Sequence, residues 1–196
     1  MSRIAAVLVT AGMAKAAPPG VDPAEFLLAM AEDTYEMVAG LELVQPVILS
    51  AGVPGLDEIA WPGTPVIGID TPAHAFAALP YGDEGVVISG DAPDLPPLLI
   101  GKLFRELGRA HIAVCPSEGG GAAAVASRLP LPEWAAPAFG EPAFDEPDLV
   151  ARLRREAPGP RMVATGPGWH RLRRPADVAR LDLGLEGWDN TRTLLT

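Results

Sequence analysis

Short apolar runs alternate with helical patterns along this chain, and this alternation is what most constrains its fold. Residues 4–10 and 85–89 are apolar almost throughout, which is typical of strands covered on both faces of a sheet. Strands that alternate with helices indicate a parallel sheet. We therefore predict an α/β fold with three layers, α/β/α, around a mostly parallel sheet. The predicted strands are residues 4–10, 44–49, 66–69, 85–89, 110–115, 122–127 and 161–164.

Helix boundary signals organise the rest of the chain. Asp22 followed by Pro23 predicts a helix start, with an N-cap side chain and proline at the first helical position, and Gly40 can end this helix. Thr71 predicts a short helix to residue 79, and further helices are predicted over about 95–107, 148–156 and 175–183. A chain of 196 residues suits one domain, which we place at residues 1–183, followed by a C-terminal tail over 184–196.

The net charge of −10 is unevenly divided between the two halves of the chain. Residues 1–100 carry two basic and thirteen acidic side chains, whereas residues 101–196 carry thirteen basic and twelve acidic ones. A nucleic-acid-binding domain would carry a basic field, so the composition argues against nucleic acid as a partner. The late basic region holds eight arginines between residues 152 and 180, which suits either a solvated surface or an anion site.

The single cysteine and the apolar runs bear on the compartment. Cys115 lies in a predicted strand and matches no metal-binding spacing, so we expect a packed, inert thiol. No apolar run is long enough to span a bilayer, and residues 4–10 suit a first core strand better than a signal peptide. We expect a cytoplasmic protein that does not bind membranes, and the sequence is compatible with a homo-oligomer.

Two loops that follow predicted strands are candidates for chemistry, because open parallel sheets bind ligands at the carboxyl ends of their strands. The loop over residues 11–22 is built of small residues and holds one cation, Lys15. Its glycines Gly12 and Gly20 suit the approach of backbone N–H groups to a phosphate. The loop contains none of the glycine-rich phosphate motifs, so an ordinary connection is the alternative.

The second loop begins with Asp91, directly after the strand predicted at 85–89. A carboxylate there is a natural ligand for Mg²⁺ or Mn²⁺, which carry a nucleotide's phosphates, and a turn-forming role is the alternative. Asp94 is predicted to cap the helix that follows. The histidines His74, His111 and His170 show no ligand spacing, and we expect each to be packed or solvated.

Four short sequence motifs occur in the same order as in a known protein family. They are Ala14-Lys15-Ala16-Ala17-Pro18-Pro19-Gly20, Asp33-Thr34, Gly90-Asp91-Ala92-Pro93-Asp94-Leu95 and Pro116-Ser117-Glu118-Gly119-Gly120-Gly121. In this order the chain resembles the GT-A-type nucleotide-diphospho-sugar transferase superfamily. Within it, the chain is similar to a bacterial glycosyltransferase-like branch related to the guanylyltransferases of molybdenum cofactor and phospholactate. The resemblance implies a GT-A (Rossmann-like) fold, a nucleotide or nucleotide-sugar donor, and Mg²⁺ or Mn²⁺ at Asp91.

Several positions depart from the pattern of that family. The Lys-Thr-Arg that would cradle phosphates is replaced by Val21-Asp22-Pro23, and Gly119 stands where the family has aspartate. Arg171 and Arg173 replace both acids of a late Asp-x-Asp motif. Of the family's acidic set only Asp91 remains, and one carboxylate holds Mg²⁺ weakly.

Two functions are weighed for this chain. The first is a transferase that moves a nucleotidyl or glycosyl group, with Lys15, Gly12 and Gly20 near the donor phosphates and residues 119–121 near the acceptor. In another form of this transferase hypothesis, the metal ion is replaced by Arg171, Arg173 and Arg174, which neutralise the phosphate directly. The second is a catalytically inactive GT-A-like scaffold that binds a ligand or a protein partner. Its contact surfaces would be the aromatic residues of 130–147 and Trp188, for which core packing is the alternative.

Overall fold

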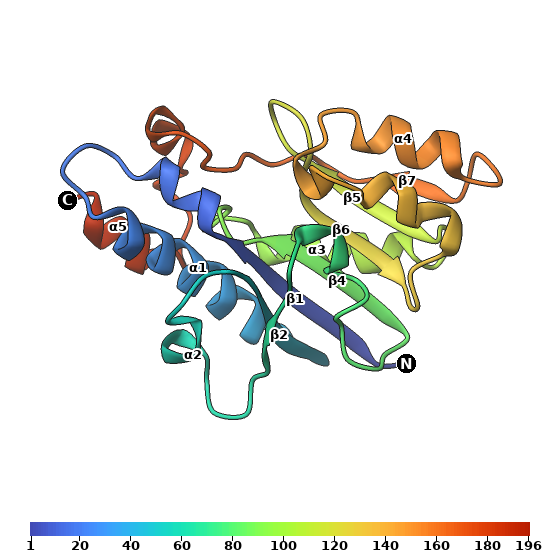
Figure 1. The fold of residues 1–196 in the computed structure, drawn as a ribbon, viewed down its shortest axis with the longest axis horizontal. Helices are drawn as coiled ribbons and strands as arrows, with labels where there is room; N and C mark the ends of the chain where they lie inside the picture. The colour runs from blue at the N-terminus through green and yellow to red at the C-terminus, as the bar shows by residue number, and fades with distance from the viewer.

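The structure is a computed structural model that describes all 196 residues and contains one seven-stranded sheet (Figure 1). Across the sheet the strands lie in the order β3-β2-β1-β4-β6-β5-β7. Neighbouring strands are parallel except at β6, which runs antiparallel to both β4 and β5. The predicted mostly parallel α/β sheet is therefore confirmed. The strands are β1 (Arg3–Thr10), β2 (Val44–Ala51), β3 (Val66–Gly68), β4 (Glu84–Ser89), β5 (Ile112–Pro116), β6 (Ala122–Arg128) and β7 (Val163–Thr165).

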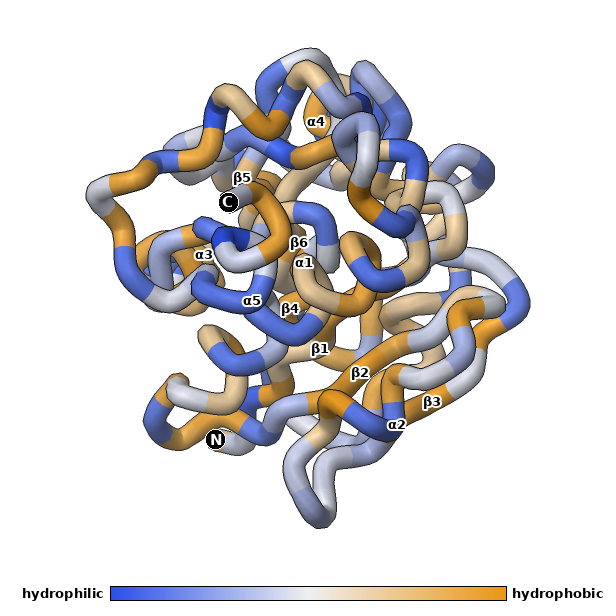
Figure 2. The backbone as a smooth tube through the Cα atoms, turned by 90° about the vertical axis from the view of Figure 1, so that its left-hand side faces the viewer, coloured by the Kyte–Doolittle hydropathy of each residue, from blue (hydrophilic) through white to orange (hydrophobic).

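Helices cover both faces of this sheet, which gives the predicted three layers (Figure 1). Successive side chains of a strand point to opposite faces, so β1 contributes to two hydrophobic clusters, one under α1, α3 and α5 and one under α4, η3 and η4. In Figure 2 the hydrophobic colour follows β1, β2 and β3, whereas α5 is largely hydrophilic. The helices are α1 (Pro23–Ala39), α2 (Leu56–Ile59), α3 (Pro97–Glu106), α4 (Leu149–Glu156) and α5 (Asp189–Leu194). The 3-10 helices are η1 (Ala11–Ala16), η2 (Pro72–His74), η3 (Glu133–Phe139), η4 (Ala143–Asp145) and η5 (Pro175–Arg180).

α1 begins where the sequence predicts it. The Asp22 carboxylate accepts hydrogen bonds from the backbone N–H groups of Ala24 and Glu25, each at 2.9 Å, and Pro23 is the first helical residue. The helix packs Phe26 and Met30 against the sheet. Because α1 also contacts η1, it fixes the position of the loop that follows β1.

Two predicted helices are shorter than expected. The helix expected over 71–79 is only the three-residue η2, although Thr71 does accept a hydrogen bond from the Ala73 N–H. The helix expected over 175–183 is the six-residue η5. Tertiary packing ends both of these 3-10 helices. Phe76, shortly after η2, packs against Phe139, and Leu181, directly after η5, is extended and enters the core.

The C-terminal tail packs onto α1 rather than standing apart from the domain. The Asp33 carboxylate accepts hydrogen bonds from the backbone N–H groups of Asn190, at 3.0 Å, and Thr191, at 2.7 Å, at the start of α5. Burial raises the pKa of Asp33, although these hydrogen bonds act in the opposite direction. Trp188 is 1% exposed and belongs to the cluster under α1, and Figure 1 shows α5 beside this helix. None of the helices has the length and apolar character needed to cross a membrane.

The aromatic side chains of residues 130–147 point largely into the protein. Phe139 and Phe144 are buried and contact each other, with ring centroids 5.6 Å apart, while Trp134 is half-buried. Trp188 is buried as well. Core packing is therefore the role of Phe139, Phe144 and Trp188, and the alternative of an exposed contact surface is wrong for these three.

The thiol of Cys115 gives a first testable expectation. Cys115 lies in β5 without exposed surface, and burial raises the pKa of its thiol to about 12. We expect no reaction of the native protein with dithionitrobenzoate at about pH 8, because almost no thiolate is present and the reagent cannot reach the sulfur. In concentrated urea one thiol per chain should react quickly. A fast reaction without urea would show that β5 is not covered as described.

Candidate functional site

Four segments meet at the edge of the sheet where β1, β4 and β5 end. η1 follows β1, Asp91 follows β4, a glycine turn over residues 117–121 follows β5, and residues 169–174 follow β7. The Leu172 N–H donates to the Asp91 carbonyl at 2.8 Å, and Nη2 of Arg173 donates to the Gly120 carbonyl at 2.7 Å. η1 packs against η5, which continues the same late segment. This edge therefore gathers most of the residues that the sequence singled out.

Asp91 and Arg171 form a buried ion pair at the centre of this edge. Nε of Arg171 donates to Oδ1 of Asp91 at 2.7 Å, and Nη2 donates to Oδ2 at 2.9 Å. The Ser89 hydroxyl donates to the same Oδ1 at 2.7 Å. Asp91 is 2% and Arg171 5% exposed. The carboxylate that the sequence marked as a metal ligand is thus bound on both oxygens by a guanidinium group.

A second carboxylate binds the other side of the same guanidinium. Nη1 of Arg171 donates to Oδ1 of Asp145, at 2.6 Å, and to the Ala122 carbonyl, at 3.3 Å. Burial alone would lower the pKa of Arg171, but the charges and hydrogen bonds of Asp91 and Asp145 outweigh it and raise this pKa. Arg171 is therefore a fixed positive charge. Asp145 went unnoticed in the sequence because it lies in an irregular proline-rich stretch without a motif.

The residues around Asp91 do not fit the expected Mg²⁺ or Mn²⁺. The chain contains no group of three histidine, cysteine, aspartate or glutamate side chains arranged to hold a metal ion. At Asp91 a divalent cation would also meet the positive charge of Arg171, since both carboxylate oxygens already accept hydrogen bonds from it. In this structure the position next to the Asp91 carboxylate, where the sequence predicts a metal ion, is taken by an arginine.

The two following arginines, Arg173 and Arg174, differ in how closely a carboxylate approaches their guanidinium groups. The Arg173 side chain is 29% exposed, and its closest carboxylate oxygen, on Asp145, lies 3.8 Å away. Burial, together with the charge of Arg171, lowers the pKa of Arg173. Arg174 is exposed and lies 3.4 Å from a carboxylate oxygen of Asp177. The positive charge of Arg173 is therefore less neutralised by a neighbouring carboxylate than that of Arg174.

The glycine turn and the first loop border these arginines. Gly119, Gly120 and Gly121 all have positive φ, and a Cβ at Gly121 would collide with the Phe144 carbonyl and come within 3.0 Å of Nη2 of Arg173. Gly12 and Lys15 lie exposed in η1, and Lys15 takes part in no ion pair. Gly20 sits in the exposed turn before α1, with φ +90° and open space around its Cα.

Asp94 does not cap the following helix. α3 begins after Pro96 with no side-chain cap, and Asp94 is buried instead. Its carboxylate accepts hydrogen bonds from Nε1 of Trp169, from the ring of His170 and from the Asp182 N–H, each at 3.0 Å. Burial alone would raise the pKa of Asp94, but these hydrogen bonds lower it. His170 is packed, as expected, and Asp94 anchors the late segment next to Arg171.

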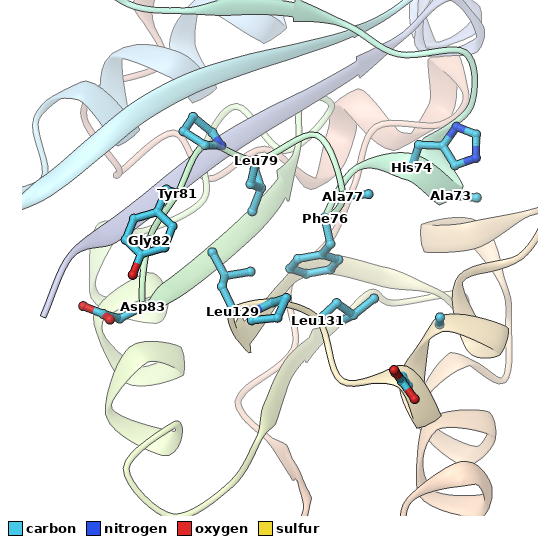
Figure 3. A pocket seen from close by; sticks show the side chains of 14 residues that line it. Ala73, His74, Phe76, Ala77, Leu79, Tyr81, Gly82, Asp83, Leu129 and Leu131 are labelled. Carbon is cyan, nitrogen blue, oxygen red and sulfur yellow. The ribbon is translucent and has the colours of Figure 1, made fainter.

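A cleft of about 800 Å³ lies at the other end of the sheet (Figure 3). Asp83, on its rim, precedes the first residue of β4, whereas Asp91 follows the last. Leu129 enters the cleft from the end of β6, and Phe76, Leu79 and Leu131 complete its apolar wall. The cleft is lined by no arginine or lysine, and its ionisable side chains are His74, Asp83 and Glu133.

The whole fold is shared with solved structures. A protein taken to be a nucleotide-diphospho-sugar transferase, from Desulfovibrio desulfuricans G20, matches with a TM-score of 0.69 and 18% identity over 98% of this chain and 95% of its own. CMP:2-keto-3-deoxy-manno-octonic acid synthetase, in complex with CTP, matches with a TM-score of 0.58 and 10% identity over 92% of this chain and 96% of its own. Rv0371c of Mycobacterium tuberculosis H37Rv, in complex with manganese, matches with a TM-score of 0.51 and 20% identity over 99% and 98%.

These likenesses define the class of fold. The chain has the GT-A-like fold of nucleotide-diphospho-sugar transferases and nucleotidyltransferases, as the sequence resemblance implied. No protein-family model matches the sequence, and a comparison with curated proteins finds no match.

Proposed function

We propose that this chain is a nucleotidyltransferase- or glycosyltransferase-like protein that binds a nucleotide or nucleotide-sugar donor at the Asp91 edge. The observation that carries the proposal is the convergence of η1, the glycine turn and the late arginines at one carboxyl edge of the sheet. Open α/β sheets bind their ligands at this edge. The likeness to a synthetase in complex with CTP supports a nucleotide as the ligand.

The donor phosphates would meet arginine and lysine rather than a metal ion. Arg173 suits this role because Nη2 bonds only a neutral carbonyl, and because the nearby Asp145 lies closer to Arg171 than to Arg173. Arg174 and Lys15 add exposed cations, and Gly12 and Gly20 leave the backbone of the first loop accessible. Arginine binds phosphate through paired N–H groups, which makes it suited to neutralising a diphosphate.

A second candidate is a catalytically inactive scaffold of the same fold. It is favoured by one observation, the engagement of both Asp91 oxygens by Arg171, since this leaves the carboxylate without a free oxygen for the reaction. Such a scaffold would bind a ligand or a protein partner and transfer nothing. Turnover of a bound donor separates the two candidates, because only the transferase consumes it.

We propose that the protein acts in the cytoplasm and that nucleic acid is not one of its partners. The acidic first half and the near-balance of charges in the second half offer no extended basic surface. The only cysteine is buried and free, as in proteins of reducing compartments. A homo-oligomer is compatible with this proposal.

Nucleotide binding is tested by thermal shift with a panel of nucleoside triphosphates and nucleotide sugars. We expect at least one member to raise the Tm, because a ligand that binds only the folded chain stabilises it. The rise should persist in excess chelator and be lost in Arg173→Ala. Arg155→Ala is the matched control, because Arg155 is an exposed arginine of α4 and should leave the shift unchanged.

Two results would count against the proposal. If no nucleotide shifts the Tm, the chain is a scaffold for a different ligand or for a protein. If the shift needs a divalent cation and survives Arg173→Ala, the donor phosphates are not held as described.

A further inference from the structure

The cleft at the far end of the sheet is formed by two connections that leave apolar side chains uncovered. Residues 73–83 lead from η2 into β4, and residues 129–136 lead from β6 into η3. Leu79, Leu129 and Leu131 are only half-buried, and Figure 3 shows them around a common centre with the Phe76 ring. A cleft of about 800 Å³ with this lining has the size and the apolar character of a small-molecule site.

The charge at the rim of this cleft is negative. Glu133 is exposed and takes part in no ion pair. The hydrogen bond from the Ser2 N–H, at 2.6 Å, lowers the pKa of Asp83, and the amino group of Met1 lies 3.8 Å from the same carboxylate. The ring of His74 points away from the leucines (Figure 3). Glu133 therefore supplies the uncompensated charge, and this charge attracts a cationic group.

Tyr81 adds an aromatic ring that packs against nothing in the free protein. It lines the cleft and is 97% exposed, which is unusual for a large aromatic residue. Figure 3 places its ring at the rim, beyond Leu79. The ring is available to cover an apolar group bound in the cleft, and its removal leaves the core of the protein intact.

We propose that this cleft is a second binding site, which takes a small apolar molecule that carries one amine. The apolar body lies against Phe76 and the three leucines, and the ammonium group faces Glu133. Asp83 precedes β4 and Asp91 follows it, so this site and the Asp91 edge lie at opposite ends of one strand. The proposal is therefore independent of nucleotide binding.

The test compares three probes that share an apolar body and differ in charge: phenylbutylamine, phenylbutanol and phenylbutyrate. Each is titrated into the full chain, and the methyl signals of Leu79, Leu129 and Leu131 in NMR spectra locate the binding. We expect the amine to bind about threefold or more tightly than the alcohol, because one exposed ion pair contributes modestly, and the carboxylate to bind most weakly. High salt should reduce the preference for the amine.

Two pairs of variants separate the shape of the cleft from its charge. Ala136→Trp fills the cleft from an exposed position in η3 and should abolish binding of all three probes, whereas Ala151→Trp, at an exposed position in α4 outside the cleft, should not. Glu133→Gln should lower the advantage of the amine over the alcohol by about twofold or more and leave the alcohol unchanged. Glu58→Gln, an exposed change in α2 with the same effect on net charge, should leave both unchanged.

Tyr81→Ala provides a third comparison. It should weaken the amine and the alcohol to a similar extent, by about twofold or more, because it removes apolar cover and no charge.

Several results would overturn the proposal. Equal affinity for the three probes contradicts the assignment of an amine, and a lack of leucine methyl shifts with all three contradicts the site itself. Binding that survives Ala136→Trp places the probe elsewhere. If sedimentation shows that the wild type dimerises and Ala136→Trp stays monomeric, a second copy of the chain covers the cleft instead.

Discussion

Asp91→Asn is expected to lower the free energy of unfolding by about 3–5 kcal/mol, because it leaves the buried Arg171 guanidinium without its main partner. Asp145 remains as a partner but is more than half exposed, so it cannot restore the lost pairing. The asparagine keeps one oxygen that can accept the Ser89 hydroxyl, but its amide nitrogen cannot accept from Arg171, so the change removes the charge together with one of the two hydrogen bonds of the pair. Urea denaturation followed by circular dichroism measures the difference.

A double variant distinguishes a broken ion pair from a general disturbance of the core. Asp91→Asn combined with Arg171→Met removes both buried charges, and we expect it to recover most of the loss, because neutral replacements of a buried pair are often tolerated. Arg109→Gln, which breaks the exposed pair of Arg109 with Glu106, should change stability by about 0–1 kcal/mol. If Asp91→Asn costs no more than Arg109→Gln, the pair does not stabilise the sheet edge.

Trp188→Ala is expected to cost about 3–5 kcal/mol, the range for loss of a large buried aromatic side chain. Trp188 is 1% exposed, its Nε1 donates to the Asp182 carbonyl at 3.2 Å, and the Arg192 guanidinium lies 4.2 Å from its ring centroid. Its loss should also detach α5 from Asp33. Hydrogen exchange at the Asn190 and Thr191 amides should then become faster.

Trp61→Ala is the matched control for this prediction. Trp61 is 50% exposed and contacts Tyr35 edge-on, so its removal should cost below about 1 kcal/mol. If the two variants lose similar stability, Trp188 does not hold the tail to the core. Unchanged exchange at Asn190 in Trp188→Ala would mean that Asp33 alone secures α5.

Local patterns predicted the frame of this protein but not the contacts of its site. The apolar runs gave the strands, and the Asp22-Pro23 pair gave the start of α1, because both depend on neighbouring residues. Asp91 and Arg171 are 80 positions apart, and Arg171 and Asp145 are 26 apart, so only the completed sheet brings them together. The departures of the late motif from the family pattern drew attention to Arg171 without showing which carboxylate this arginine would bind.

Asp94 illustrates how long-range partners override a local preference. Its position before a helix predicts a cap, yet the donors it binds come from residues 169, 170 and 182. These three donors satisfy the buried carboxylate more fully than one helix terminus would. No pattern within a short window of sequence contains that information.

The guanidinium of Arg171 has a consequence for how this protein depends on its surroundings. A metal ion must be acquired from the cell and can be lost to starvation or to competing chelators, whereas an arginine is present in every molecule from synthesis. Its charge stays at one position because Asp91 and Asp145 hold it there. The chain itself therefore supplies the positive charge that lies between these two carboxylates at the edge of its sheet.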